Sequence, residues 1–146
     1  MKFKGSVSLT GNLSNFKSFA KNMDRIMSQA NGMAALEIRN EAVQLIADNS
    51  DGTATIRYMP KRTVKVSNPG EPPNADTGRL MQSIKVEKDG LAYLVGTNLK
   101  YGAWLEFGTL DMAPRPWLSV AVKNISKYIP DFYAKAYDNF VKGLKG

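Results

Sequence analysis

The carboxylate best suited to chemistry in this sequence is Glu106, which lies between Trp104-Leu105 and Phe107. Burial among apolar side chains raises the pKa of a carboxyl group, and a raised pKa suits a general acid. Acid–base catalysis also needs a second group, and the nearest acidic residue in the sequence is Asp111. One interpretation of this segment is therefore a hydrolase that uses carboxylates and is centred on Glu106.

A structural role for Glu106 is the interpretation that we favour. The planar guanidinium group of an arginine suits a half-buried carboxylate, and Arg79 and Arg115 are the two candidate partners. We expect such an ion pair to hold the chain where it turns at Gly108-Thr109. A Glu106→Gln substitution would then leave a buried charge without its partner, at a cost of about 3–5 kcal/mol in stability.

The composition excludes several classes of enzyme. The chain of 146 residues contains no cysteine and no histidine, so thiolate nucleophiles, histidine-dependent triads and the common zinc sites are ruled out. The sequence also contains no glycine-rich phosphate-binding motif. Only acid–base or metal chemistry based on carboxylates survives these exclusions. Because we favour a structural role for Glu106, we predict no catalytic residue, no metal and no cofactor in this protein.

The charge balance is basic, and this favours acidic partners such as nucleic acid. The 20 Lys and Arg residues exceed the 13 Asp and Glu residues, which gives a formal net charge of +7. The basic residues are scattered, and no predicted helix combines them with asparagine or glutamine in a pattern that suits a DNA groove. A small basic nucleic-acid-binding protein remains the alternative function, whereas weak contact with the nucleic-acid backbone would suit the wall of a channel.

The elements that must position these residues begin with a long helix over 13–47. Its apolar residues recur at spacings of three and four, and Asn12 or Ser14 can cap its start. Because glycine costs about 1 kcal/mol inside a helix, we expect a kink or a break at Asn31-Gly32. The run from Asn49 to Gly52 ends the helix.

Two hairpins are predicted after this helix. Alternating β-branched and polar residues indicate a first hairpin from 53–58 and 62–67, and a loop rich in proline and glycine follows to residue 78. We expect the region of about 52–78 to form a flexible arm. The second hairpin pairs 80–88 with 91–97 through Asp89-Gly90, as a type I′ turn with positive φ at both central residues.

The last part of the chain is predicted to be mainly helical. A short helix or turn covers 101–107, and extended chain covers 112–115 because residues before proline avoid the α region. Pro116 can occupy the first turn of the next helix, which Pro130 interrupts or restarts. Together the elements predict one α+β domain over 1–146, in which a small antiparallel sheet packs against the long N-terminal helix and a C-terminal helix.

The apolar stretches are too short for a membrane protein. The N-terminal segment lacks the continuous apolar stretch of a signal peptide, and no run of about 18 apolar residues is present. We therefore expect no membrane partner, and a protein that stays in the cytoplasm or in a particle assembled there.

Three stretches of the sequence, taken together, resemble a known family. They are PPNADTGRLMQSI, VGTNLKYGAWLEFGT and MAPRPWL, and in this order they are similar to the tail-completion, or head–tail joining, family of long-tailed bacteriophages and prophages. The resemblance covers Gly70 to Val122 closely and the flanking helices by position. The sequence departs from the family pattern at Gly102, where alanine is common, at Trp117, where phenylalanine is common, and through the additional Pro114.

The resemblance implies a structural protein of the virion without enzymatic activity. Members of the family form a ring, commonly a hexamer, at the head–tail junction. The ring contacts the head connector or stopper protein and the tail tube protein, and DNA passes through its lumen non-specifically. The resemblance also implies that the protein is found in the host cytoplasm during assembly.

A closed head-to-tail ring needs two different patches on each subunit. We expect the flexible arm and the segment Glu106–Trp117 to form these patches, and free subunits to be monomeric because ordering the arm costs entropy. The interface or structural residues that we predict are Asp76, Thr77, Gly78, Tyr101, Glu106, Phe107, Gly108, Thr109, Arg115, Pro116 and Trp117.

Overall fold

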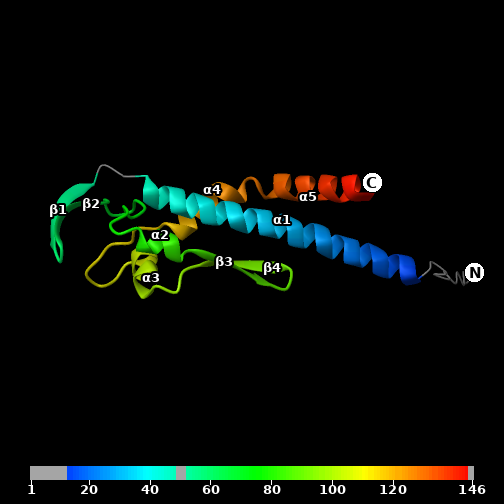
Figure 1. Ribbon diagram of the computed structural model, residues 1–146, viewed down its shortest axis with the longest axis horizontal. Coiled ribbons are helices and arrows are strands. Elements are labelled where there is room, and N and C mark those ends of the chain that lie inside the picture. The colour runs from blue at the N-terminus through cyan, green and yellow to red at the C-terminus, as the bar shows by residue number, and fades with distance from the viewer. Residues whose placement is uncertain (1–12, 49–51, 145–146) are drawn as a thin grey trace, which may run out of the picture.

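The computed structural model describes residues 13–48 and 52–144, with side chains from Phe16 onward. The predicted cap at Asn12 or Ser14 and the segment 49–51 therefore lie outside what can be described. Figure 1 shows an elongated molecule in which one long helix runs along most of the length. The α+β class predicted from the sequence is confirmed.

The long helix is α1 (Leu13–Ala47), which has 35 residues and is about 50 Å long at 1.5 Å per residue. Helices α4 (Leu118–Ser126) and α5 (Ile129–Leu144) pack on one side of α1, and the second hairpin lies on the other (Figure 1). The buried residues of α1 recur at helical spacing and are Ile26, Ala30, Ala35, Ala42 and Ile46. α1 is therefore the axis that the other elements share.

The predicted kink or break at Asn31-Gly32 is wrong, because α1 is continuous there. The Asn31 side chain donates a hydrogen bond to the Leu91 carbonyl at 2.8 Å and accepts one from the Tyr133 hydroxyl at 2.9 Å. A Cβ atom at Gly32 would lie 3.1 Å from the Tyr93 ring. Glycine at this position therefore makes room for the hairpin, and contacts from two neighbouring elements offset its low helix propensity.

The strands form two separate antiparallel hairpins instead of the one small sheet that was expected. The first hairpin pairs β1 (Thr53–Tyr58) with β2 (Lys61–Val66), and the second pairs β3 (Lys85–Asp89) with β4 (Ala92–Gly96). The two hairpins lie far apart along α1 (Figure 1). Both hairpins were predicted, but each contacts a different part of the molecule.

The predicted strand over 80–88 is wrong in its first half. Residues Arg79–Ser83 form the short helix α2, and the strand begins at Lys85. In this arrangement both Leu80 and Ile84 lie in the core. A strand would place Gln82 on the same face as Leu80 and Ile84, whereas the helical turn leaves Gln82 exposed while both apolar side chains are buried.

The turn of the second hairpin also differs from the prediction. Asp89 pairs with Ala92, so the central residues are Gly90 and Leu91. Gly90 has a φ of 61°, and no non-glycine residue in the described ranges has a positive φ. The predicted type I′ turn is therefore wrong in position, because Asp89 is not central, and in type, because Leu91 lacks the positive φ that such a turn requires.

The helices near the C-terminus start close to the prolines, as expected. The predicted short helix is α3 (Lys100–Phe107), and residues 112–115 are not helical. Pro130 lies in the first turn of α5 and so restarts the helix, since the missing N–H has no partner to lose there. Pro116 precedes α4 instead of opening it, and the N-cap of α4 is Trp117.

Two clusters of buried side chains hold the elements together. The larger cluster joins α1, α2 and α4, and consists of Ala42, Ile46, Leu80, Ile84, Trp117 and Ala121. The smaller cluster joins α1 to α5, and consists of Ile26, Ala30 and Ala136. Among residues 13–48 and 52–144, no helix combines the length and apolar character needed to cross a bilayer.

Candidate functional site

The Glu106 carboxylate caps the start of α4. Its Oε2 atom accepts hydrogen bonds from the backbone N–H groups of Trp117 and Leu118, both at 2.8 Å, and its Oε1 atom accepts one from Ser119 at 3.0 Å. The first N–H groups of a helix have no acceptor within the helix, and they carry a partial positive charge. A side chain of α3 therefore supplies to α4 the negative charge and the acceptors that its start requires.

These contacts set the protonation state of Glu106. Partial burial acts to raise its pKa, but hydrogen bonds from the Ser119 hydroxyl and from the N–H groups of Leu118, Trp117 and Ser119 outweigh burial, so the pKa lies below its ordinary value of 4.5. A general acid needs a raised pKa. The geometry thus removes the reason for treating Glu106 as a catalytic acid.

The predicted ion pair between Glu106 and an arginine is wrong. Arg115 donates through Nε to the Ser67 carbonyl at 3.1 Å, and its backbone N–H donates to the Leu105 carbonyl at 2.6 Å. The ion pairs of the described residues involve Asp76 instead. Three backbone donors at a helix start satisfy the Glu106 carboxylate, which leaves it no need of a guanidinium partner.

Trp117 anchors the same junction from inside the core. Its side chain is only 2% exposed, and its indole Nε1 donates to the Gly102 carbonyl of α3 at 3.0 Å. A Cβ atom at Gly102 would lie 2.6 Å from Thr97 Cγ2 and 3.7 Å from Trp117 Cζ2. The two departures from the family pattern at Gly102 and Trp117 are therefore in contact through this hydrogen bond, but it is the close approach of Thr97, not of Trp117, that leaves no room for a side chain at position 102.

The segment after α3 forms a closed, protruding loop. Gly108 has a φ of 79°, and a Cβ atom there would lie 2.7 Å from the Met112 carbonyl oxygen. The Thr109 N–H donates to that same carbonyl at 2.8 Å, and the Asp111 N–H donates to Thr109 Oγ1 at 3.3 Å. We call Thr109–Met112 the tip, and its Leu110 side chain is 105% exposed.

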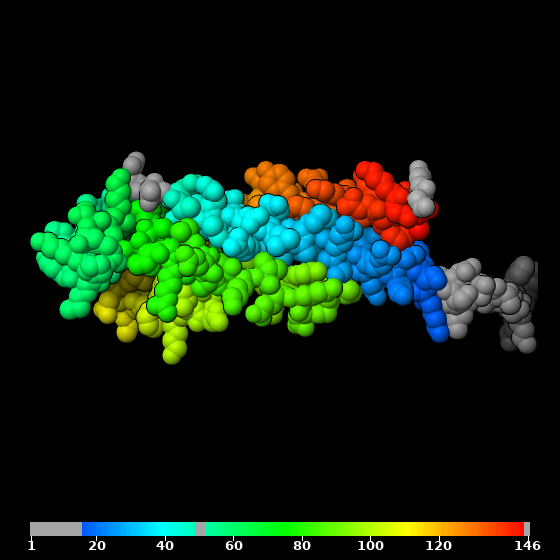
Figure 2. All heavy atoms as spheres, viewed as in Figure 1, coloured from blue at the N-terminus to red at the C-terminus, as the bar shows by residue number. Residues whose placement is uncertain are grey.

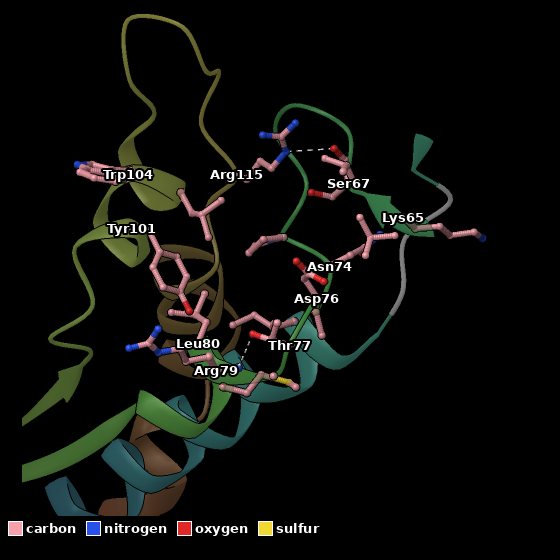
Figure 3. Close-up of a pocket in the computed structure, with 18 of the residues that line it drawn as sticks. Lys65, Ser67, Asn74, Asp76, Thr77, Arg79, Leu80, Tyr101, Trp104 and Arg115 are labelled. Carbon is pink, nitrogen blue, oxygen red and sulfur yellow. Dashed lines mark hydrogen bonds between the residues drawn. The ribbon is translucent and has the colours of Figure 1, made fainter. Parts of the chain in front are cut away.

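A pocket of about 400 Å³ lies beside α3, and Figure 3 shows the residues around it. Its walls come from β2, from the loop before α2, and from α2, α3 and the segment that leads into α4. Of the predicted site residues, the pocket lining includes Asp76, Thr77, Gly78, Tyr101 and Arg115. It does not include Glu106, Phe107, Gly108, Thr109, Pro116 or Trp117, so the predicted site divides into a pocket and a junction.

Asp76 fastens the first hairpin to the pocket. Arg62 of β2 donates to its carboxylate through Nε at 2.9 Å and through a terminal nitrogen at 2.8 Å, and Arg57 of β1 lies 3.7 Å away. Arg57 and Arg62 were not among the predicted site residues. Their signal is the hairpin register, which places the two arginines directly opposite each other, and like charges in that position need an anion between them.

The remaining predicted residues of the pocket have local roles. Gly78 has a φ of 72° and is the N-cap of α2, and the Thr77 hydroxyl accepts a hydrogen bond from the Arg79 N–H at 3.4 Å. Tyr101 packs against the larger core cluster from α3. Within the described ranges, no group of three or more Asp and Glu side chains lies close enough together to hold a metal ion.

The comparisons with known proteins identify the family. The family model described as "Bacteriophage HK97-gp10, putative tail-component" matches residues 13–108, about two thirds of the chain. No curated protein and no solved structure matches the chain. The match extends from α1 through Glu106 to Gly108, and so includes both hairpins and most of the pocket. The chain therefore belongs to the HK97-gp10-like family of bacteriophage tail components.

Proposed function

We propose that copies of this tail component close into a ring, which is a hexamer as the resemblance implies. The ring completes the tail and joins the tail tube protein to the head connector or stopper protein, and DNA passes through its lumen. In this role the protein is a structural part of the virion at the head–tail junction. The family match supports the structural role in the tail, and the surface described next supports the ring.

The observation that carries the proposal is the distribution of exposed apolar side chains. The most exposed of them lie at the start of α1, on the first hairpin, on α3 with its tip and at the end of α5, and Figure 2 shows these segments spread along the length of the molecule. A monomeric soluble protein seldom leaves large apolar patches uncovered. The most exposed large side chains in these places are Phe16, Phe19, Tyr58, Met59, Phe107, Leu110 and Leu144.

The patches differ from one another, and this difference favours a ring over a symmetric dimer. An isologous dimer brings the same patch of two copies together, whereas a closed ring joins two unlike patches at every contact. The first hairpin supplies an outer face with Ile56 and Tyr58 beside Lys61 and Lys65. The tip at the end of α3 supplies a compact apolar knob with a different shape. Each copy therefore has the two unlike surfaces that ring closure needs.

The basic charge supports a lumen that contacts DNA without reading its sequence. A net charge of +7 attracts phosphates, and such contacts weaken steeply as the salt concentration rises. The alternative function, a nucleic-acid-binding protein that recognises sequence, would retain tight binding at physiological salt. A filter-binding titration with salt separates the two, because selective binding at physiological salt would favour the alternative.

The ring itself is tested by native mass spectrometry and negative-stain microscopy of purified protein at increasing concentration. We expect monomers at micromolar concentration, because assembly orders the arm, and closed rings with a central opening at high concentration. A protein that stops at a dimer, or that stays monomeric throughout, would contradict the ring.

A further inference from the structure

The pocket beside α3 combines an apolar wall with cations that lack partners. The side chain of Arg79 makes no hydrogen bond or ion pair within the described part of the chain. Arg115 uses Nε for the Ser67 carbonyl, and its terminal nitrogens make no hydrogen bond to a described residue. The apolar lining includes Val64, Val66, Pro73, Leu80, Tyr101 and Leu105. A pocket of about 400 Å³ is within the size range of ligand sites.

A buried hydroxyl group in the pocket wall also lacks a partner. Ser67 is only 3% exposed, and its Oγ atom makes no hydrogen bond. Figure 3 shows this residue next to Arg115, at the boundary of the pocket. A buried hydroxyl without a partner is costly, but Ser67 Oγ is closed to solvent, so a carboxylate in the pocket would accept from the terminal nitrogens of Arg115. The pocket thus suits an occupant that offers an apolar side chain beside a carboxylate.

The tip has this combination of side chains. Leu110 is fully exposed, and Asp111 is exposed next to it and forms no ion pair in the described structure. Neither side chain lines the pocket of its own copy, because Met112 is the residue of the tip that the pocket lining includes. The hydrogen bonds inside the tip and the positive φ of Gly108 hold its shape before any contact is made. Such preorganisation lowers the entropy cost of docking.

We propose that the tip of one copy docks into the pocket of the next copy, with Leu110 against the apolar wall and Asp111 against the unpaired cations. This pairing rests on the proposed ring. It names the tip and the pocket as the two surfaces of the repeated contact, and so uses the inner face of the first hairpin, with Val64 and Val66, in place of its outer face. The two surfaces are different, so the contact is heterologous and can be repeated around a ring. Charge complementarity selects a second copy of this chain as the occupant.

Cysteine cross-linking tests the pairing, because the natural chain contains no cysteine. One preparation carries Thr109→Cys in the tip, the other carries Thr77→Cys at the pocket, and a short bis-maleimide joins cysteines that approach each other. The control replaces Thr77→Cys with Ser126→Cys, since Ser126 is an exposed residue at the end of α4, outside the pocket lining and outside the first hairpin. We expect mixed Thr109–Thr77 dimers to exceed the Thr109–Ser126 dimers by about tenfold, which corresponds to about 1.4 kcal/mol.

A second set of variants tests the chemistry of the contact. Adding Asp111→Lys or Leu110→Ser to the Thr109→Cys protein should remove most of the preferred cross-link. Leu91→Ser should leave the preferred cross-link unchanged, since Leu91 is an exposed leucine at the turn of the second hairpin. Far-UV circular dichroism of each variant confirms that the fold is intact, as expected for exposed positions.

The outcomes separate this pairing from the ring itself. Wild-type rings that form without a preferred Thr109–Thr77 cross-link, or that persist with Asp111→Lys and Leu110→Ser, would overturn the pairing and leave the ring standing. A double Thr109→Cys, Thr77→Cys protein should give a ladder of products longer than a dimer. A ladder that stops at the dimer would support the pocket contact and overturn the ring.

Discussion

The junction between α3 and α4 and the hairpin of β1 and β2 are built in opposite ways. At the junction, the Glu106 carboxylate accepts three backbone hydrogen bonds and Trp117 is 2% exposed. In the hairpin, every residue of β1 is exposed, and the attachment to the pocket depends on the ion pairs of Asp76. One region is fixed by burial, and the other by charges near the surface.

The difference indicates that one region stabilises the fold of the subunit and that the other is available for contacts between subunits. Buried apolar area supplies most of the stability of a fold, and the junction lies in the larger core cluster. Exposed ion pairs contribute little, about 0–1 kcal/mol, so the hairpin can be altered with small effect on the isolated subunit. We therefore expect substitutions at the junction to unfold the protein, and substitutions in the hairpin to act mainly on its motion and on assembly.

The largest expected effect is that of Trp117→Ala. Removing a buried tryptophan costs about 3–5 kcal/mol, and here the Gly102 carbonyl also loses its donor. Urea denaturation followed by far-UV circular dichroism measures the loss. Trp104→Ala is the matched control, because Trp104 is on the same helix as Gly102 but is 53% exposed, and it should cost less than about 1 kcal/mol. Equal losses for the two variants would contradict the proposed contrast.

A smaller effect is expected for Glu106→Ala. This substitution leaves the first N–H groups of α4 without their acceptor, at a cost of about 2–3 kcal/mol for charge-assisted hydrogen bonds. The cost is below the 3–5 kcal/mol expected for a broken ion pair, because no buried arginine is left alone. Glu106→Gln keeps one acceptor oxygen and should lose less than Glu106→Ala in the same urea experiment.

The pH dependence gives a control for the Glu106 prediction. The folded protein holds the pKa of Glu106 below its ordinary value of 4.5, so the unfolded state binds this proton more readily. The stability from the carboxylate is therefore fully present above the unfolded pKa and is lost as the pH falls through the folded pKa. The difference in unfolding free energy between wild type and Glu106→Gln should shrink below pH 4.5, and a difference that stays constant would count against the cap.

The sequence predicted most elements, because their signals are local. Apolar spacing identified α1, alternation identified both hairpins, and Pro130 marked the start of α5. The failures occur where a distant contact overrides a local preference. Gly32 stays helical because Tyr93 packs against it. Arg79–Ser83 forms a helical turn, which buries Leu80 and Ile84 in the core while it leaves Gln82 exposed.

The candidate site was predicted in its residues but not in its contacts. The sequence analysis selected Glu106, Trp117 and the stretch that contains Asp76. The structure places Glu106 and Trp117 in one junction and Asp76 in the wall of the pocket. The partner of Glu106 is a set of backbone N–H groups, and a sequence gives no sign of which side chain will meet a helix start eleven or more residues away. The flexibility predicted for the region of about 52–78 stays a prediction.

The smallest expected effect on global stability is that of Asp76→Asn, which tests this flexibility. The substitution keeps the size of the side chain but removes the charge that Arg57 and Arg62 share, so the cost should stay below about 1 kcal/mol. Hydrogen exchange measured by mass spectrometry should nevertheless become faster in β1 and β2, because the two opposed arginines then repel each other. Asp89→Asn, at the end of β3 in the other hairpin, should leave that exchange unchanged. Unprotected amides in β1 and β2 of the wild type would instead show that Asp76 does not hold the hairpin, and that the arm is flexible in the free subunit.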